Sequence, residues 1–292
     1  MSHRFLRSIG FSEARNRKDI KKILKLVLMS PTEKQYVTLP DDSIAVEYRK
    51  DFSDTFGIAV CGEFSDDADF DYEFYYPYFK GQYVSTTTDI ELERLAEVES
   101  FEGVFDDTRI GISIIFRLQN RLDYLKLLMR DDVTVVRNAV TLSGLAESGT
   151  ILLPIKKDKH QVIQEKKDTI ERNKLIADAR AGDEIAMETL TLKDIDIYST
   201  ISRRIMTDDV FTLVDTYVMP CGLECDIYSV MGEILDMKDM SNDLSGEDVC
   251  VMTLNCNDLV FDVCINKTDL IGEPMKGRRF KGTIWLTGKI DF

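Results

Sequence analysis

The first regular pattern in the chain is an amphipathic helix after Asn16. Asn16 has a side chain suited to an N-cap, and Ser30-Pro31 is the sequence at which the pattern ends. Between them, apolar residues recur at helical spacing, namely Ile20, Ile23, Leu24, Val27 and Leu28. The remaining positions are rich in lysine, so we predict one buried face and one basic, exposed face.

After this helix the apolar period changes from about four residues to two, which is typical of strands. The strand candidates are Tyr36–Leu39, Ile44–Tyr48, Phe56–Phe64, Asp69–Phe79, Tyr83–Leu95 and Arg109–Leu118. A helix is expected over Asn120–Arg130. A closing hairpin is expected from Ala139–Leu145 and Thr150–Ile155, turning at Glu147-Ser148-Gly149. Residues 1–157 are therefore predicted to form an α+β domain with an antiparallel sheet.

Residues 158–205 have no strand pattern and are predicted to be a helical connector. Gly182 separates two helical stretches, and Thr191-Leu192-Lys193-Asp194 fits the start of a further helix as a capping box. Ile197, Ile201 and Ile205 then lie on one stripe, four residues apart. Such a stripe requires a partner surface.

Residues 206–292 return to strand patterns and are predicted to be a small five-stranded β-domain. The strand candidates are Phe211–Met219, Asp226–Leu235, Val249–Cys256, Leu259–Ile265 and Arg279–Ile290. Asn257-Asp258, between two alternating runs, predicts a two-residue hairpin turn. An OB-like barrel is the alternative to an open sheet. The fold class of the whole chain is predicted as α+β.

Composition limits the class of protein. With 44% apolar and 30% charged residues the chain is that of a soluble globular protein, and no run of about 18 apolar residues could span a membrane. No signal peptide precedes the helix, so we expect a cytoplasmic protein. The formal charge is −15, although residues 1–26 carry eight Lys or Arg and only two Asp or Glu. This acidic body makes nucleic-acid binding an unfavourable interpretation.

The residues of common catalytic and metal sites are scarce. His3 and His160 are the only histidines, and no phosphate-binding glycine loop or nucleophile elbow occurs. Cys221 and Cys225 form a single Cys-x₃-Cys pair, a weak zinc signal, and the other cysteines lie mostly in strand-like runs and are expected to be reduced and buried. We therefore assign no catalytic residue, no metal and no cofactor.

One cationic segment stands out in this acidic chain. Gly277-Arg278-Arg279 forms a turn that leads towards Trp285, the only tryptophan. Guanidinium groups bind carboxylates and phosphates in a bidentate manner, so Arg278, Arg279 and Trp285 are candidate ligand-binding residues. They would form a site if Arg203 and Arg204 converge on them. The alternative is an exposed turn whose charges pair with Asp262, Asp269 or Glu273.

Five passages resemble an uncharacterised bacterial family, found mainly in gut Clostridia and catalogued only as a domain of unknown function. They are His3–Phe11, Ile115–Asn120, Leu190–Arg204, Val210–Gly232 and Phe261–Gly288. The passages extend over nearly the whole chain. The resemblance implies no activity and no catalytic residue.

The sequence thus leaves the function unknown and supports two hypotheses. We predict a non-enzymatic cytoplasmic interaction or regulatory protein, with an unknown protein as its partner. This prediction rests on the missing catalytic residues and on the opposed charges of residues 1–26 and the body. The alternative is a binder of, or an enzyme acting on, a small anionic metabolite at Arg278 and Arg279.

Overall fold

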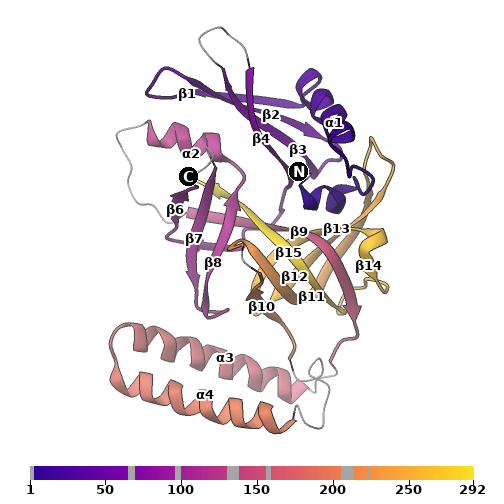
Figure 1. Cartoon of the computed structure of the whole chain (residues 1–292). Coiled ribbons are helices and arrows are strands. Elements are labelled where there is room, and N and C mark those ends of the chain that lie inside the picture. The colour runs from indigo at the N-terminus through magenta and orange to yellow at the C-terminus, as the bar shows by residue number, and fades with distance from the viewer. Residues whose placement is uncertain are drawn as a thin grey trace.

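The computed structural model describes residues 3–64, 70–95, 100–129, 138–155, 159–204, 214–222 and 224–292. It confirms the predicted α+β class, with two β-sheets and a small number of helices (Figure 1). The smaller sheet comes from the N-terminal part of the chain. The larger sheet is mixed and draws its strands from both halves of the sequence.

The N-terminal sheet is an antiparallel meander covered by helix α1 (Arg17–Met29). Asn16 caps this helix as predicted, because its side chain accepts hydrogen bonds from the amides of Lys18 and Asp19. Ile20 and Val27 are buried on its inner face. The strands follow in chain order as β1 (Glu33–Thr38), β2 (Ile44–Asp51), β3 (Phe56–Phe64) and β4 (Phe70–Phe79).

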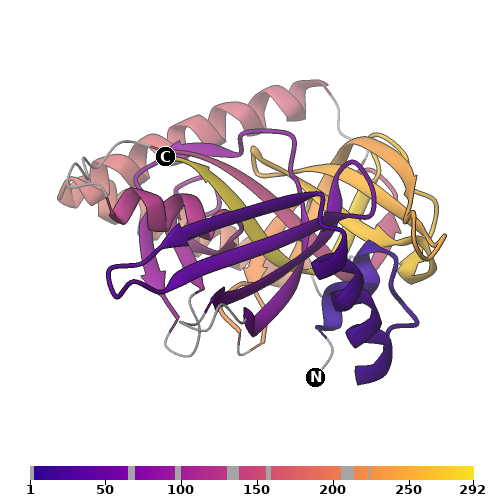
Figure 2. The same ribbon diagram turned by 90° about the horizontal axis from the view of Figure 1, so that it is seen from above.

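A short 3₁₀ helix, η1 (Arg4–Ile9), joins the two sheets into one core. Phe5, Leu6 and Ile9 are buried, and they pack in a cluster that contains residues of the N-terminal sheet as well as Trp285 of the larger sheet. Figure 2 shows this N-terminal segment (indigo) beside the strands of the larger sheet drawn in orange and yellow. The apolar residues of the basic N-terminus are therefore part of the core.

Five strands of the larger sheet close into a ring. Each is hydrogen-bonded to the next in the order β11, β12, β13, β9, β15 and back to β11. The C-terminal strands thus form a barrel, the alternative that the sequence left open, but the fifth strand is β9. The bounds are β9 (Asn138–Leu152), β11 (Ile227–Ser241), β12 (Asp248–Cys256), β13 (Leu259–Asn266) and β15 (Arg279–Asp291), and β10 (Tyr217–Pro220) pairs with β11 outside the ring.

The predicted hairpin around Glu147-Ser148-Gly149 is wrong, because these residues lie inside the continuous strand β9. Strand β15 pairs with β9 from Leu152 to Ala139, and a shift of register at Thr283 and Ile284 accommodates the irregular step. Gly149 is needed for packing. A Cβ atom there would come within 2.2 Å of the Phe280 ring.

Three further strands extend the larger sheet, β6 (Glu91–Arg94), β7 (Phe101–Asp107) and β8 (Ile112–Leu118). Strand β8 joins the barrel through a short parallel pairing with Thr287 and Gly288 of β15. Helix α2 (Arg121–Leu128) follows it and contacts β1 and β2 of the N-terminal sheet. The predicted strand Tyr83–Leu95 is divided into β5 (Thr86–Thr88) and β6, and the patterns did not identify β7.

The remaining short elements complete the barrel. Element η2 (Lys267–Asp269) and strand β14 (Leu270–Ile271) connect β13 to β15, and β14 pairs with β9. Asn257 and Asp258 form the predicted hairpin between β12 and β13, with φ values of 51° and 65°. Both values lie in the left-handed region, which Asn and Asp tolerate better than most residues.

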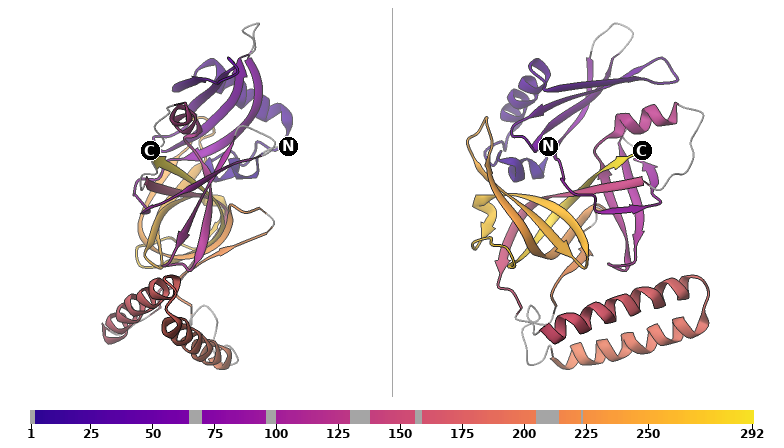
Figure 3. Two further views of the ribbon diagram at one scale, coloured as in Figure 1. Left: turned by 90° about the vertical axis from the view of Figure 1, so that its left-hand side faces the viewer. Right: turned by 180° about the vertical axis from the view of Figure 1, so that it is seen from behind.

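The predicted helical connector is an antiparallel pair, α3 (Lys159–Arg180) and α4 (Glu184–Arg204), with Gly182 between the helices. It projects from the barrel in every side view (Figures 1 and 3). The predicted helix start at Thr191 is wrong. Asp183 accepts from the amides of Ile185 and Ala186 and begins α4, whereas the Thr191 hydroxyl donates to the Met187 carbonyl within the helix.

The predicted domain boundaries at 157 and 206 coincide with the two ends of this helical pair. They do not coincide with a break in the larger sheet, because β9 precedes the pair and β11 follows it, and both belong to the barrel. None of the helices in the described ranges is long and apolar enough to cross a membrane.

Candidate functional site

The helical pair α3–α4, hereafter the arm, exposes large apolar side chains. In α4 the exposed fractions are 76% for Ile185, 58% for Leu192 and 56% for Ile195, and in α3 that of Ile170 is 70%. Single exposed apolar residues are ordinary on protein surfaces, but several on one small element indicate an interaction surface. The arm is therefore the first candidate site.

The three exposed residues of α4 form a stripe. Ile185 and Leu192 are seven residues apart and Ile195 follows three later, so all three lie on one side of the helix. Ala186, which is buried, lies about 100° from Ile185 and about 180° from Ile195 around the helix axis. The outer side of α4 therefore carries three large apolar side chains, beside the exposed Glu188, that the described chain leaves uncovered.

One ion pair sets the position of α3 along the axis of α4. The Lys193 ammonium group lies 2.8 Å from a Glu171 carboxylate oxygen. This pair places Ile170 of α3 at the same height along the arm as Leu192 and Ile195 of α4. These three residues thus lie around the middle of the arm, whereas Ile185 lies near its tip.

Arg279 anchors the base of the arm to the barrel. Its Nε donates to the carbonyl of Leu153, which follows β9, and its Nη1 donates to the carbonyl of Val214, which precedes β10, at 3.1 and 2.9 Å. Burial lowers the pKa of this guanidinium from its ordinary value. One side chain therefore binds both chain segments that lead into and out of the arm.

The predicted cationic site has a different arrangement from the one expected. Arg278 is half-buried and donates to the backbone carbonyl of Glu273, within the same turn. Arg203 and Arg204 lie in α4, but their side chains are outside the described residues, so their convergence on Arg278 and Arg279 stays a prediction. Asp269, one of the suggested partners, instead pairs with Arg7.

Trp285 is buried beneath the N-terminal segment, away from solvent. Its indole N–H donates to Asp226 at 2.6 Å, and the ring of His3 lies 4.7 Å from its ring centroid. Arg117 lies beside Asp226, with Nε 3.6 Å from the carboxylate. Burial, together with the charges of Arg117 and Arg4, lowers the pKa of His3 to about 3. His3 is therefore neutral at physiological pH and is part of an aromatic core.

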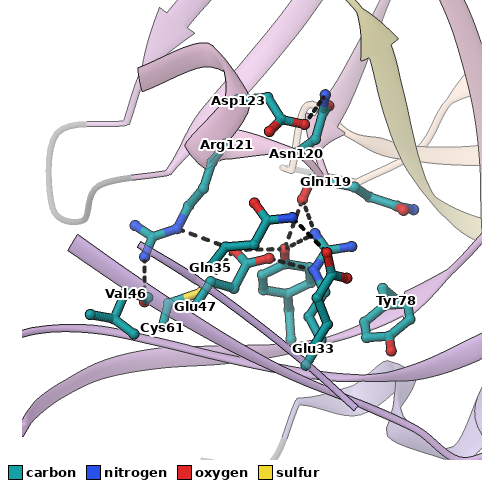
Figure 4. Close-up of polar contacts among 12 residues, drawn as sticks. Glu33, Gln35, Val46, Glu47, Cys61, Tyr78, Gln119, Asn120, Arg121 and Asp123 are labelled. Carbon is teal, nitrogen blue, oxygen red and sulfur yellow. Dashed lines mark hydrogen bonds and ion pairs between the residues drawn. The ribbon is translucent and has the colours of Figure 1, made fainter. Parts of the chain in front are cut away.

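A buried ion cluster lies between the N-terminal sheet and α2 (Figure 4). The carboxylate of Glu47 on β2 pairs with Arg49 on the same strand and with Arg121 on α2, and the exposed fractions of Glu47 and Arg121 are 3% and 2%. Arg121 also donates to the Val46 carbonyl. Arg49 donates to the carbonyl of Gln119 at the end of β8. The cluster thus connects the two sheets.

The protonation states in this cluster oppose acid–base or nucleophilic chemistry. Burial alone would raise the pKa of Glu47, but Arg49 and Arg121 outweigh it and hold the pKa below its usual value. Burial raises the pKa of Cys61 and of Tyr76 well above their usual values. At neutral pH the Glu47 carboxylate is therefore ionised, while the Cys61 thiol and the Tyr76 phenol keep their protons.

A groove of about 630 Å³ lies between α1 and the turn that joins β11 to β12. Its apolar wall is formed by Phe11, Ala14, Ile23, Leu26 and Leu244. Carboxylates border it, from Glu13, Asp19 and Glu247, together with the ammonium group of Lys22. The groove therefore favours an apolar ligand that carries a positive charge.

The cysteines lie in the environments that the strand patterns predict. Cys250, Cys256 and Cys264 are buried and free, and Cys221 and Cys225 are also free thiols. Among the described residues, no group of three or more His, Cys, Asp or Glu side chains is placed to hold a metal ion.

Sequence reasoning missed the exposed stripe of α4. It selected Ile197, Ile201 and Ile205, whose side chains are outside the described residues, because four-residue spacing is the familiar signal of an amphipathic helix. The stripe could have been found from the spacing of its residues, because Leu192 follows Ile185 by seven positions and Ile195 follows Leu192 by three. No local signal identifies the Glu47 cluster, since its members lie far apart in the chain.

Comparison with known proteins gives one match. Residues 6–288 match the model of a family described as "Domain of unknown function, E. rectale Gene description (DUF3881)". The match confirms the resemblance to a family of unknown function. No curated protein and no solved structure matches the chain.

Proposed function

We propose that this chain, which belongs to the DUF3881 family, is a non-enzymatic interaction protein whose α3–α4 arm binds a partner. The observation that carries the proposal is the outer side of α4, where Ile185, Leu192 and Ile195 are each more than half exposed on an element that projects from the barrel (Figure 3). The family description adds no activity to this observation.

The energetics favour a partner on the arm. Burying an isoleucine or leucine side chain contributes about 1.5–3 kcal/mol, so the three residues of the stripe offer several kcal/mol to a complex. Arg279 fixes the base of the arm, which reduces the conformational entropy lost when a partner binds. An anchored arm with an uncovered apolar face is an efficient docking element.

The buried groups support the non-enzymatic part of the proposal. Glu47, whose pKa is lowered, binds Cys61 and Tyr76, whose pKa values are raised well above their usual values, and it also pairs with the arginines. Catalytic groups need pKa values near the working pH and access to substrate. A screen of hydrolase and phosphatase substrates would refute this part if it gave reproducible turnover.

The proposal includes a cytoplasmic location. All six cysteines are free thiols, and Cys225 is exposed to solvent. Such thiols persist in a reducing compartment and are oxidised or paired outside it. Fractionation of cells that produce the protein would test the location.

The arm is tested by site-specific photo-crosslinking. A photoreactive phenylalanine analogue replaces Ile185 or Leu192 in the arm, and, as matched exposed controls, Met29 of α1 or Ile271 of β14. Irradiation in a concentrated lysate of the native cells should give discrete adducts from the arm positions only. Equal labelling from all four positions, or adducts from the controls alone, would refute the arm as the binding element.

A second candidate function is the binding of a small amphipathic cation in the groove beside α1. Its apolar wall and its three carboxylates are the observations that favour it. Phenethylamine and phenylacetate have similar apolar bodies and opposite charges, so they make a matched pair of probes. Thermal stabilisation by the amine alone, abolished by Leu26→Glu, supports this candidate, and equal responses to both probes contradict it.

Anion binding at Arg278 and Arg279 remains an alternative proposal that requires a rearrangement. Arg279 would have to release the carbonyls of Leu153 and Val214 before its guanidinium could bind a phosphate or carboxylate. A panel of phosphates, nucleotides and carboxylates tests the alternative by thermal shift. A stabilisation that Arg278→Ala and Arg279→Ala remove would favour it over the arm.

A further inference from the structure

We infer that the partner of the arm is a second copy of this chain, bound so that two arms form an antiparallel four-helix bundle. The inference rests on the proposed function of the arm and adds the identity of its partner. In such a bundle the stripe of Ile185, Leu192 and Ile195 faces the partner's arm, while Ala186 stays in the seam between α3 and α4. Each arm then supplies two of the four helices.

Charge favours this partner. Residues 159–204 contain nine Lys or Arg and nine Asp or Glu, so the arm is formally neutral, and the other 246 residues carry the whole charge of −15. These 246 residues are hereafter the body. Two copies of the chain repel each other wherever their acidic bodies meet, but two neutral arms do not repel each other. A strongly basic partner would be drawn to the body rather than to a neutral arm.

The antiparallel arrangement also separates the bodies. Helices of 22 and 21 residues are about 33 and 32 Å long at 1.5 Å per residue. When the tip of one arm lies at the base of the other, the two bodies stand roughly 30 Å apart, several times the ~8 Å screening length at physiological salt. The repulsion between two bodies of charge −15 is then largely screened.

The two helices have opposite net charges, which matches the same arrangement. Helix α3 has six Lys or Arg and four Asp or Glu, and α4 has three and four, giving net charges of +2 and −1. In an antiparallel two-fold dimer, α3 of one copy can lie against α4 of the other. The arrangement therefore brings together helices of opposite sign on both sides of the symmetry axis.

The contact area is large enough for a stable dimer. Two adjacent helices, each about 10 Å wide and 33 Å long, present a face of roughly 650 Å². Two such faces bury about 1,300 Å² in total, which lies within the roughly 1,200–2,000 Å² of specific interfaces. Leu192 and Ile195 of α4 supply apolar contacts near the middle of the arm, and binding energy is concentrated near the centre of an interface.

The test is the mass of the full chain in solution, by size-exclusion chromatography with light scattering from 1 to 200 µM. The expected mass at the higher concentrations is twice the 33.4 kDa of one chain. The variant Leu192→Glu/Ile195→Glu places two carboxylates on the stripe of each copy. Its dissociation constant should rise by roughly 100-fold or more, because apolar anchors are lost and charges of one sign meet.

A matched control separates the arm from exposed apolar residues elsewhere in the chain. Met29→Glu/Ile271→Glu adds the same charge at two exposed apolar positions outside the arm, in α1 and β14. The control should remain dimeric. Circular dichroism should show that both variants keep their secondary structure, because glutamate favours helices.

Three results would overturn the inference: a wild-type mass of 33.4 kDa at 200 µM, a stripe variant that dimerises like the wild type, or a control that dissociates as readily as the stripe variant. The proposed function has a separate readout. A monomeric wild type that still gives arm-specific photo-adducts with another protein leaves the arm as a binding element and removes only its self-association. A monomer without such adducts refutes both.

Discussion

The body of the protein and its arm distribute polarity in opposite ways. The body buries Glu47 and Arg121 almost completely, whereas the arm leaves Ile185 and Ile170 largely exposed. Both arrangements are costly, since buried charges lose hydration and exposed apolar groups order water. The difference is that the body contains the partners of its unusual groups, and the described part of the arm does not.

This contrast separates two roles for a buried charge or an exposed apolar side chain. Such a residue either stabilises the fold or binds a partner. Each charge in the Glu47 cluster has its counterion or a carbonyl within hydrogen-bonding distance, so the cluster serves the fold. Ile185 and Ile195 of α4 have no equivalent cover among the described residues, so we assign their role to an interaction. The predictions below test the two assignments by their effects on stability.

The largest effect is expected from Glu47→Gln. The substitution leaves the guanidinium groups of Arg49 and Arg121 buried without their carboxylate, which should lower the free energy of unfolding by about 3–5 kcal/mol. Urea unfolding followed by fluorescence measures the change. Glu33→Gln, at an exposed position of the same sheet, is the control and should change stability by less than about 0.5 kcal/mol.

A smaller loss is expected from Arg279→Ala. The carbonyls of Leu153 and Val214 lose a charged donor, which should cost about 2–3 kcal/mol and loosen the base of the arm. Limited proteolysis should then cut at the base several-fold faster than in the wild type. Arg278→Ala, which removes a single bond within an exposed turn, should behave like the wild type, and equal cleavage of both variants would contradict the anchoring role.

Acid should lower the free energy of unfolding, because His3 is protonated more readily in the unfolded chain than in the folded protein. Its pKa is about 3 in the folded protein and 6.5 in the unfolded chain, so protons bind preferentially to the unfolded state between these values. The resulting stability is complete above pH 6.5 and is lost as the pH falls towards 3, by about 2 kcal/mol between pH 6.5 and 5. Urea unfolding at pH 7, 6 and 5 should show this slope in the wild type and a flatter one in His3→Phe.

The smallest effect is expected from Ile185→Ala in the arm. Its side chain contacts solvent in the single chain, so the free energy of unfolding at submicromolar concentration should change by less than about 0.5 kcal/mol. Ile284→Ala is the matched substitution in the barrel core and should cost about 2–5 kcal/mol. Similar losses for both would show that the arm is covered within one chain.

Much of the local structure followed from residue patterns. Asn16 and the apolar spacing after it gave α1, and the alternation from Leu259 to Ile265, with Asn257-Asp258 before it, gave a hairpin with both turn residues at positive φ. These features depend on neighbours in the chain, which is why they can be predicted from it. The failure at Gly149 has a tertiary cause, because its role is set by the ring of Phe280, 131 positions away.

The candidate site was predictable only in outline. Arg278, Arg279 and Trp285 were selected for charge and rarity, but Arg279 anchors two backbone segments and Trp285 pairs with Asp226 in the core. A residue type indicates which bonds a side chain can make, and the fold determines which partners lie within reach.

The sequence by itself determined the α+β class, the capped first helix, the two-helix insertion and the excess of acidic charge. These are properties of composition and of short-range periodicity, with propensities and apolar patterns as their physical cause. Only the tertiary structure decided that β9 closes the barrel across the insertion, that Glu47 meets Arg121, and that Ile185, Leu192 and Ile195 of α4 stay uncovered by the residues that the structure describes. Each of these depends on which distant surfaces meet, and burial and electrostatic pairing act on those surfaces only after the chain has brought them together.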